Sequence, residues 1–224
     1  MNYFLIPLLV VSFTLCAVAE STKQPEPEVF SWALPEDISG TPFESVAARL
    51  RSTPAMRASF VQNKWFPGSE KPIVATGDFL LGTKEDEGLS WKTKTPLPMT
   101  LVVTRDFIAI RDHKGKLRRI GSAMAHLRGY ADVMLAMFSA DVNEIRSFFD
   151  VYFGFTNNTW IIGLKPKEKR LQKLMSHATL SGRDTIEGIS FLGPKGDRTE
   201  FVFSDIFVEP TELSEEEAAI FIEK

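Results

Sequence analysis

Short segments with alternating apolar and polar residues constrain this chain more than any other feature. The first set lies between residues 56 and 112 and reads MRASFVQNKWF, PIVATGDFLL, GLSWKTKTP, MTLVV and FIAIRD. Turn-forming Gly, Pro, Asp or Asn residues separate these segments, as they do the strands of a β-meander. We therefore expect consecutive antiparallel strands in this part of the chain.

These segments also predict a sheet with one apolar and one polar face, because successive side chains of a strand point to opposite sides. One side of the second segment carries Ile73, Ala75, Gly77, Phe79 and Leu81. One side of the third carries Leu89, Trp91, Thr93 and Thr95, whereas Ser90, Lys92 and Lys94 point the other way. Pro96 and Pro98 cannot donate ladder hydrogen bonds, so we expect the sheet to break or bend before residues 101–103.

A second set of strands is expected in the C-terminal half. The segments are FDVYFGF, TWIIGL, QKLMSHATL, TIEGISFL and RTEFVFSDI, with turns at Asn157-Asn158 and at PKGD. Two short helices frame the strands. Residues 43–51 have apolar residues at helical spacing ahead of Pro54, and Ser214 with Glu217 has the spacing of a capping box.

Residues 123–138, AMAHLRGYADVMLAMF, predict a third and much more apolar helix. One side would carry Met124, Leu127, Ala131, Met134, Leu135 and Phe138. Together with Tyr130, Val133 and Met137 this makes the helix apolar over more than half of its circumference, and such a helix must be buried. Strands with a few helices place the chain in the α+β class.

The first nineteen residues have the pattern of a cleavable signal peptide. A long apolar run is followed by the small-x-small sequence Ala17-Val18-Ala19. We therefore expect residues 1–19 to be removed after export to the periplasm, residues 20–34 to form a flexible segment, and residues 35–224 to form one domain. An uncleaved membrane anchor, or a lipid on Cys16, the chain's single cysteine, is the alternative, although lipid attachment needs Gly or Ala where Leu15 stands.

Composition and motifs argue against nucleic-acid binding and against catalysis. The formal net charge is -3, whereas nucleic-acid binding needs a basic surface. His113, His126 and His177 do not have the spacing of metal ligands, and Ser122 lacks the flanking glycines of a nucleophile elbow. We expect neither enzymatic activity nor a cofactor or metal.

The order of the motifs resembles that of the periplasmic lipoprotein carriers of the LolA family. A helix precedes ASFVQ, then come GDFLL and LSWKTKTPLPMTLVVTRDFIAI, and later TWIIGLKPKEKRLQKLMSHATL, IEGISF and GDRTEFVFSDI. The resemblance covers most of residues 40–208. Two departures point to a divergent paralogue. The family has a basic residue shortly after the GDLW-like strand, and the nearest match here is Thr83-Lys84, which acidic residues follow. The tail SEEEAAIFIEK is also shorter than in carriers that have an added C-terminal strand.

The resemblance implies an unclosed antiparallel β-barrel, or half-barrel, whose concave apolar face is covered by helices. A cavity between them would bind acyl chains of a lipoprotein or of another lipidated cargo. Its expected lining is Phe60, Phe79, Leu81, Trp91, Leu101, Val103, Met124, Met134, Met137 and Phe138. In an ordinary protein the same residues would simply form the core, and that alternative stays open.

The resemblance also implies a monomeric shuttle that receives cargo from an inner-membrane exporter and delivers it to an outer-membrane acceptor. Two basic clusters, residues 111–119 and 165–173, are either solvated loops or docking surfaces for an acidic partner or for lipid headgroups. The docking residues would be Arg118, Arg119, Lys167, Lys169 and Arg170. Two other functions stay open: a lipid-sensing regulator, which would be expected to have a further interaction domain, and a small enzyme with His126 or His177 as its base.

Overall fold

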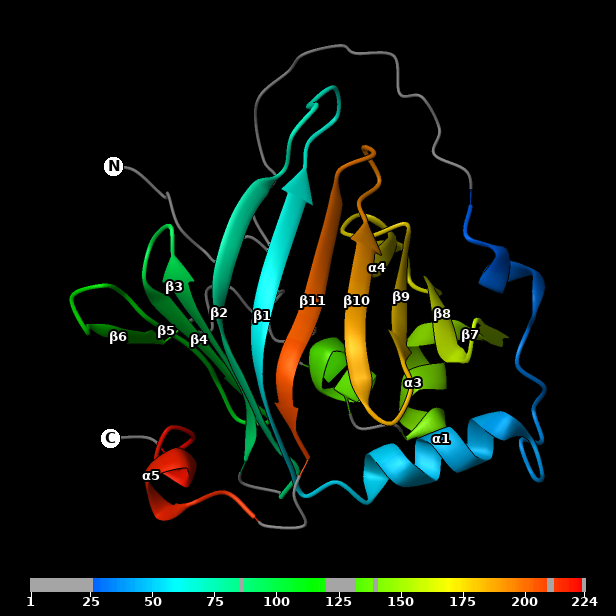
Figure 1. The fold of residues 1–224 in the computed structure, drawn as a ribbon, viewed down its shortest axis with the longest axis horizontal. Helices are drawn as coiled ribbons and strands as arrows, with labels where there is room; N and C mark the ends of the chain where they lie inside the picture. The colour runs from blue at the N-terminus through cyan, green and yellow to red at the C-terminus, as the bar shows by residue number, and fades with distance from the viewer. Residues whose placement is uncertain (1–25, 85–86, 120–131, 139–140, 209–211, 223–224) are drawn as a thin grey trace. The chain divides into compact units, whose positions relative to one another are not determined.

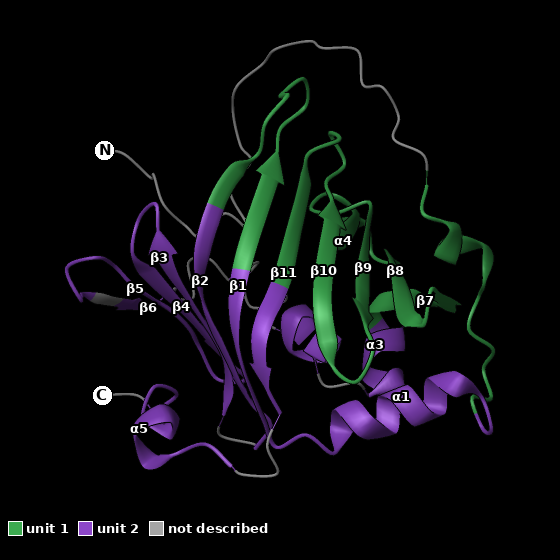
Figure 2. Ribbon diagram, viewed as in Figure 1, with its two compact units in different colours: residues 1–38, 61–74, 148–202 green, residues 39–60, 75–147, 203–224 purple. Residues whose placement is uncertain are grey.

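The structure is a computed structural model that describes residues 26–84, 87–119, 132–138, 141–208 and 212–222. The chain divides into two compact units (Figure 2). Unit 1 comprises residues 1–38, 61–74 and 148–202, and unit 2 comprises residues 39–60, 75–147 and 203–224.

Eleven strands form one antiparallel sheet that is not closed into a barrel, which confirms the predicted α+β half-barrel class (Figure 1). The order is β6-β5-β4-β3-β2-β1-β11-β10-β9-β8-β7. The strands of the N-terminal half are β1 (Ala55–Trp65), β2 (Ile73–Gly82), β3 (Gly88–Thr95), β4 (Met99–Thr104), β5 (Ile108–Arg111) and β6 (Leu117–Arg119). The others are β7 (Phe149–Thr156), β8 (Thr159–Pro166), β9 (His177–Gly182), β10 (Ile186–Leu192) and β11 (Arg198–Phe207).

The predicted strands agree with the observed ones except in the two basic clusters. The break predicted at Pro96 and Pro98 separates β3 from β4. The expected strand over residues 172–180 begins only at His177, because Lys169–Gln172 form the short helix α4 with Leu171 buried. In the other cluster, Leu117–Arg119 form β6, which pairs with β5 in the register Ala109↔Arg119.

Unit 1 includes regular structure before residue 35, within the segment 20–34 that was expected to be flexible. Glu28–Ser31 form a 3₁₀ helix, η1, with Val29 and Phe30 buried. The Leu34 backbone N–H donates to the Val151 carbonyl at 2.9 Å. The Phe30 ring lies where a Cβ on Gly163 of β8 would be, with its Cε1 2.8 Å from that position. This segment is therefore attached to β7 and β8.

Helices of unit 2 begin at side chains that satisfy their free backbone N–H groups. In α1 (Pro42–Arg51) the Thr41 hydroxyl accepts from the Glu44 N–H, and Phe43, Val46 and Ala47 are buried. Residues 132–138 are helical, which agrees with the end of the predicted helix; residues 123–131 lie outside the described residues. The helix α3 (Val142–Phe148) was not predicted, although Asp141 accepts from the N–H groups of Asn143 and Glu144.

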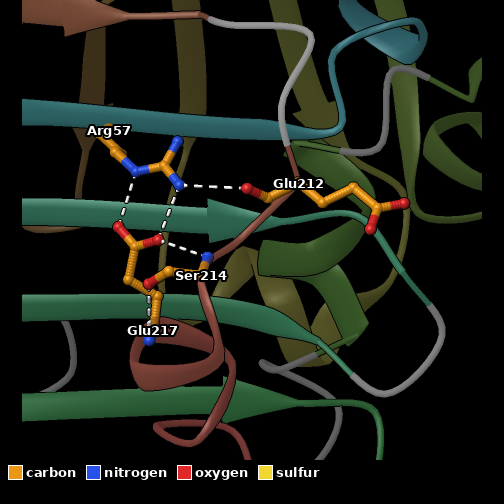
Figure 3. A network of polar contacts seen from close by, with 4 residues as sticks. All are labelled: Arg57, Glu212, Ser214 and Glu217. Atoms are coloured by element: carbon orange, nitrogen blue, oxygen red, sulfur yellow. Dashed lines mark hydrogen bonds and ion pairs between the residues drawn. The ribbon is translucent and has the colours of Figure 1, made fainter.

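The predicted capping box is present at the last helix, α5 (Glu215–Ala218), where it is part of a larger polar network (Figure 3). The Ser214 hydroxyl accepts from the Glu217 N–H, and the Glu217 carboxylate accepts from the Ser214 N–H. The same carboxylate accepts from Arg57 Nε at 2.6 Å and from Arg57 Nη2 at 2.7 Å. This bidentate pair attaches α5 to β1 within unit 2.

The Arg57 guanidinium and the Ser214 bonds lower the pKa of Glu217 to about 2. A carboxyl whose pKa is lowered on folding stabilises the fold above its ordinary pKa near 4.5, and that contribution is lost as pH falls toward 2. We expect Glu217→Gln to lower the free energy of unfolding by about 1 to 2 kcal/mol at pH 7, since the pair is partly solvated. Denaturant unfolding from pH 7 to pH 2 should show this difference disappearing below about pH 4.5.

The matched control is Glu216→Gln, which removes the same charge from an exposed position in the same turn. It should change the free energy of unfolding little. A Glu217→Gln effect of equal size at pH 7 and pH 2 would contradict the proposed role of the ion pair.

Candidate functional site

Five aromatic side chains from four strands and one helix meet in unit 2. They are Phe60 of β1, Phe79 of β2, Trp91 of β3, Phe203 of β11 and Phe138 of the helical residues 132–138, and all are buried. The centroid of the Phe79 ring lies 5.0 Å from those of Trp91 and Phe138 and 5.3 Å from that of Phe203. Phe60 contacts Trp91 at 5.5 Å. We call these five residues the aromatic cluster.

The strand register places the predicted lining residues on one face. Phe79 lies directly opposite Trp91, and Trp91 lies opposite Leu101. In the next row Leu81 lies opposite Leu89, which lies opposite Val103. Residues directly opposite in a sheet share a face, so these six apolar side chains form two adjacent buried rows. The period-2 prediction is confirmed for these residues but is wrong at two positions: Ile73, at the start of β2, is exposed, and Ser90, predicted on the polar face, is buried.

Gly77 provides the space that the Phe60 ring occupies. A Cβ on Gly77 would lie 2.7 Å from Phe60 Cζ and 2.0 Å from the Lys92 carbonyl oxygen. Both distances are shorter than real Cβ contacts, and the second involves backbone. A glycine at this position of GDF therefore allows the ring to lie over β2.

In the described part of the helix, residues 132–138, the buried side only partly coincides with the predicted one. Its buried side chains are Val133, Ala136, Met137 and Phe138, whereas Met134 and Leu135 are only half-buried. Of the predicted lining residues, Phe138 reaches the aromatic cluster and Met137 is buried. Met124 lies outside the described residues.

Phe203 is the member of the cluster that sequence reasoning missed. The segment RTEFVFSDI was predicted as a strand, but the side of the sheet that Phe201 and Phe203 occupy was not assigned. The alternation of the two phenylalanines was the available signal. Both are buried, and Phe203 contacts Phe79 and Trp91.

The predicted docking residues are exposed, and carboxylates lie near several of them. In unit 2, Arg118 Nη2 lies 3.9 Å from Asp112 Oδ2, and the Arg119 guanidinium carbon is 4.8 Å from the centre of the Phe107 ring. In unit 1, Lys167 Nζ lies 3.9 Å from Asp150 Oδ1 and Arg170 Nη2 lies 3.3 Å from Glu168 Oε2. Lys169 is exposed on α4. The positive charge of both clusters is therefore partly compensated.

The structure describes the surroundings of two of the three histidines. His177 of β9 lies with its ring centroid 4.7 Å from that of Phe30, and burial lowers its pKa. His113 is exposed in the turn before β6, and His126 lies outside the described residues. Within the described ranges, no three His, Cys, Asp or Glu side chains come together as a metal site requires.

The opposite face of the same strands has a groove with a volume of about 330 Å³ in unit 2, lined by both charged and apolar side chains. Its lining includes Arg57, Lys92 and Glu217 beside the apolar Leu80 and Ile220. Arg57 and Glu217 are ion-paired in this groove, and Phe79 contributes to its lining as well as to the aromatic cluster. No helix among the described residues is long and apolar enough to cross a membrane.

Comparison with solved structures gave relatives of low sequence identity. An outer membrane lipoprotein-sorting protein domain from Vibrio parahaemolyticus is 9% identical with a TM-score of 0.45, over 80% of this chain and 95% of that one. A LolA superfamily protein from Nitrosomonas europaea is 7% identical with a TM-score of 0.42, over 80% and 97%. MucB of Pseudomonas aeruginosa, in its complex with MucA, is 13% identical with a TM-score of 0.43, over 79% and 59%.

A search of curated proteins gave no match. The model of the family described as "Outer membrane lipoprotein carrier protein LolA" matches residues 51–214, which is well over half of the 224 residues. These residues include the strands and the whole aromatic cluster. The chain therefore belongs to the LolA family.

Proposed function

We propose that this protein is a periplasmic carrier that binds the acyl chains of a lipoprotein or another lipidated cargo at the aromatic cluster and takes it from the inner to the outer membrane. The observation that carries the proposal is the cluster itself in a chain of the LolA family: five buried rings that meet on the apolar side of a sheet. The cluster offers apolar contact and no described reactive group, so it suits binding rather than catalysis.

The protein's own side chains must fill such a site when cargo is absent, because an empty site would bind cargo too tightly to release it. Burying three acyl chains of about 16 carbons at roughly 0.8 kcal/mol per methylene would contribute about 38 kcal/mol. The strongest non-covalent complexes reach only about 18 to 21 kcal/mol. A carrier that releases its cargo must therefore lose other contacts when cargo binds.

The helical residues 132–138 provide contacts of that kind. The ring of Phe138 lies against Phe79, and the preceding residue, Met137, is also buried. Each aromatic pair contributes about 0.5 to 1.5 kcal/mol beyond its buried area. Met side chains repack easily around irregular apolar shapes. An acyl chain that displaces Phe138 would exchange these contacts for its own, which keeps its binding reversible.

Met134 tests the site because it is only half-buried, so a change there should spare the fold. We expect the mature protein to bind an apolar fluorescent probe that fatty acid displaces, and Met134→Lys to weaken probe binding at least about tenfold, since a charge would have to be desolvated. Fluorescence titration measures the affinity, and circular dichroism checks the fold.

Asp132→Lys is the matched control, because it places a lysine at an exposed position of the same helix. Its probe affinity should stay within about twofold of wild type. Equal affinities for wild type and Met134→Lys would contradict the predicted place of Met134 in the site, and failure of the wild type to bind the probe would indicate that the helix and the rings are only core.

Export is the second part of the proposal. The intact mass of the protein purified from the periplasm should correspond to a chain that begins at Glu20, after cleavage behind Ala19. A species that retains residues 1–19, or one with a diacylglyceryl group on Cys16, would contradict this.

Delivery to the acceptor is the third part, and it concerns the basic residues of unit 1. If Lys167, Lys169 and Arg170 dock on an acidic acceptor or on anionic headgroups, their attraction acts over about 8 Å at physiological salt. Reversing the three charges should therefore slow transfer to acceptor membranes severalfold at low salt and leave probe binding unchanged. Transfer assays at low and high salt measure the effect.

The carboxylates of Asp150 and Glu168 near these residues favour the simpler alternative of a solvated surface. Charge reversal of Arg118 and Arg119 in unit 2 tests the other cluster in the same assay. Transfer at the wild-type rate at low salt in either variant would exclude that cluster as a docking surface.

A further inference from the structure

The alternation of β1 continues into unit 1, but there its buried positions hold polar side chains. Gln62 and Lys64 are only 5% and 3% exposed. They occupy alternate, buried positions of the strand, where a sheet of this kind ordinarily has Val, Leu or Phe. Burying a polar group costs free energy unless it forms a hydrogen bond. Simple packing therefore does not account for these two residues.

Gln62 has an amide donor that no atom of the described residues accepts from. Its Nε2 is buried without a hydrogen-bond partner among the described residues. Nearly all buried polar atoms in proteins are hydrogen-bonded, so an exception of this kind suggests a ligand. The donor lies on the buried side of the strand, away from bulk solvent.

Lys64 brings positive charge to the same side of β1. Its Nζ lies 3.9 Å from Asp197 Oδ2 and 5.2 Å from the centre of the Phe66 ring. The first distance is that of an ion pair but too long for a hydrogen bond. Burial lowers the pKa of Lys64, and the Asp197 carboxylate opposes that change. The charge of the ammonium is thus already balanced by a neighbouring carboxylate.

Through Asp197, Lys64 lies near the start of β11, along which buried apolar residues follow in unit 1. Asp197 precedes β11 by one residue, and Thr199, two residues further, is buried opposite Phe191. In the neighbouring row Ile189 lies opposite Phe201, and both are buried. Polar donors therefore lie at one end of an apolar row, an arrangement that matches a lipid with a polar group at the end of its hydrocarbon chain.

We propose that Gln62 and Lys64 form, within unit 1, a polar anchor for the ester carbonyl oxygen of a bound lipid. This rests on the carrier function proposed above and names the chemistry that the carrier recognises. Both side chains donate hydrogen bonds, and an ester carbonyl only accepts them. A carboxylate or phosphate would add a second buried negative charge beside Asp197, whereas a neutral ester leaves the Lys64–Asp197 pair balanced.

Two lipids that differ only in the carbonyl test the anchor. The mature wild-type protein should bind 1-palmitoylglycerol at least about fivefold more tightly than 1-hexadecylglycerol, its ether analogue, because a buried donor stays unpaired with the ether. Gln62→Leu should reduce this ratio to less than half without weakening ether binding, and the remaining preference is attributed to Lys64. The ratio does not depend on the folded fraction of a variant, so partial unfolding cannot produce the result.

Asn63→Leu is the matched control, because it changes a carboxamide to leucine on the other side of β1 and should keep the ester preference. The double variant Lys64→Met with Asp197→Asn removes the ion pair without leaving an unpaired charge and should also lower the ratio. Palmitate should bind more weakly than the ester at pH 7.

The outcomes separate the two proposals. Equal binding of ester and ether by wild type, an unchanged ratio in Gln62→Leu, or palmitate that binds more tightly than the ester would overturn the anchor and leave the carrier function standing. Failure of the wild type to bind any of the three lipids would overturn the carrier function and the anchor with it.

Discussion

The pairing of Phe79 with Trp91 across β2 and β3 is the contact on which the rest of unit 2 depends. A shift of one residue in this register would move every side chain of the strand to the other face. The rings of Phe138 and Phe203 each contact both residues, so they have their present surroundings only in this register. Gly77 belongs to the same arrangement, because its missing side chain leaves room for the ring of Phe60.

The sequence predicted the strands well because alternation and turn residues act locally, and it predicted the face of Phe79 and Trp91 for the same reason. Phe203 could not be placed, since only the sheet order brings β11 to the first strands. The helix was apolar over more than half of its circumference, so its pattern did not specify which side is buried. Helices α3 and α4 have only seven and four residues, too few for a periodic signal. The lining of a lipid cavity by these residues stays a prediction.

Some charged residues could not be paired from the sequence because their partners are distant along the chain. Arg57 and Glu217 are 160 positions apart and meet through the attachment of α5 to β1. Asp150 lies near Lys167 because β7 pairs with β8, in the register Asp150↔Lys165. A basic run in the sequence therefore overstates the free positive charge of the folded surface. The bidentate pair with Glu217 has a clear structural role, whereas the exposed pairs of the basic clusters are ordinary surface electrostatics.

Apolar contact alone is a poor basis for choosing among lipids. The hydrophobic effect is proportional to the area removed from water and has no preferred direction, so an apolar surface accepts hydrocarbon chains in many positions. A hydrogen bond to a carbonyl is directional and depends on the chemical identity of the group. If Gln62 and Lys64 contact the ester, they contribute little to total affinity but determine which end of the lipid lies at β1. Affinity low enough for release and selectivity for one class of lipid then come from different residues of the same sheet.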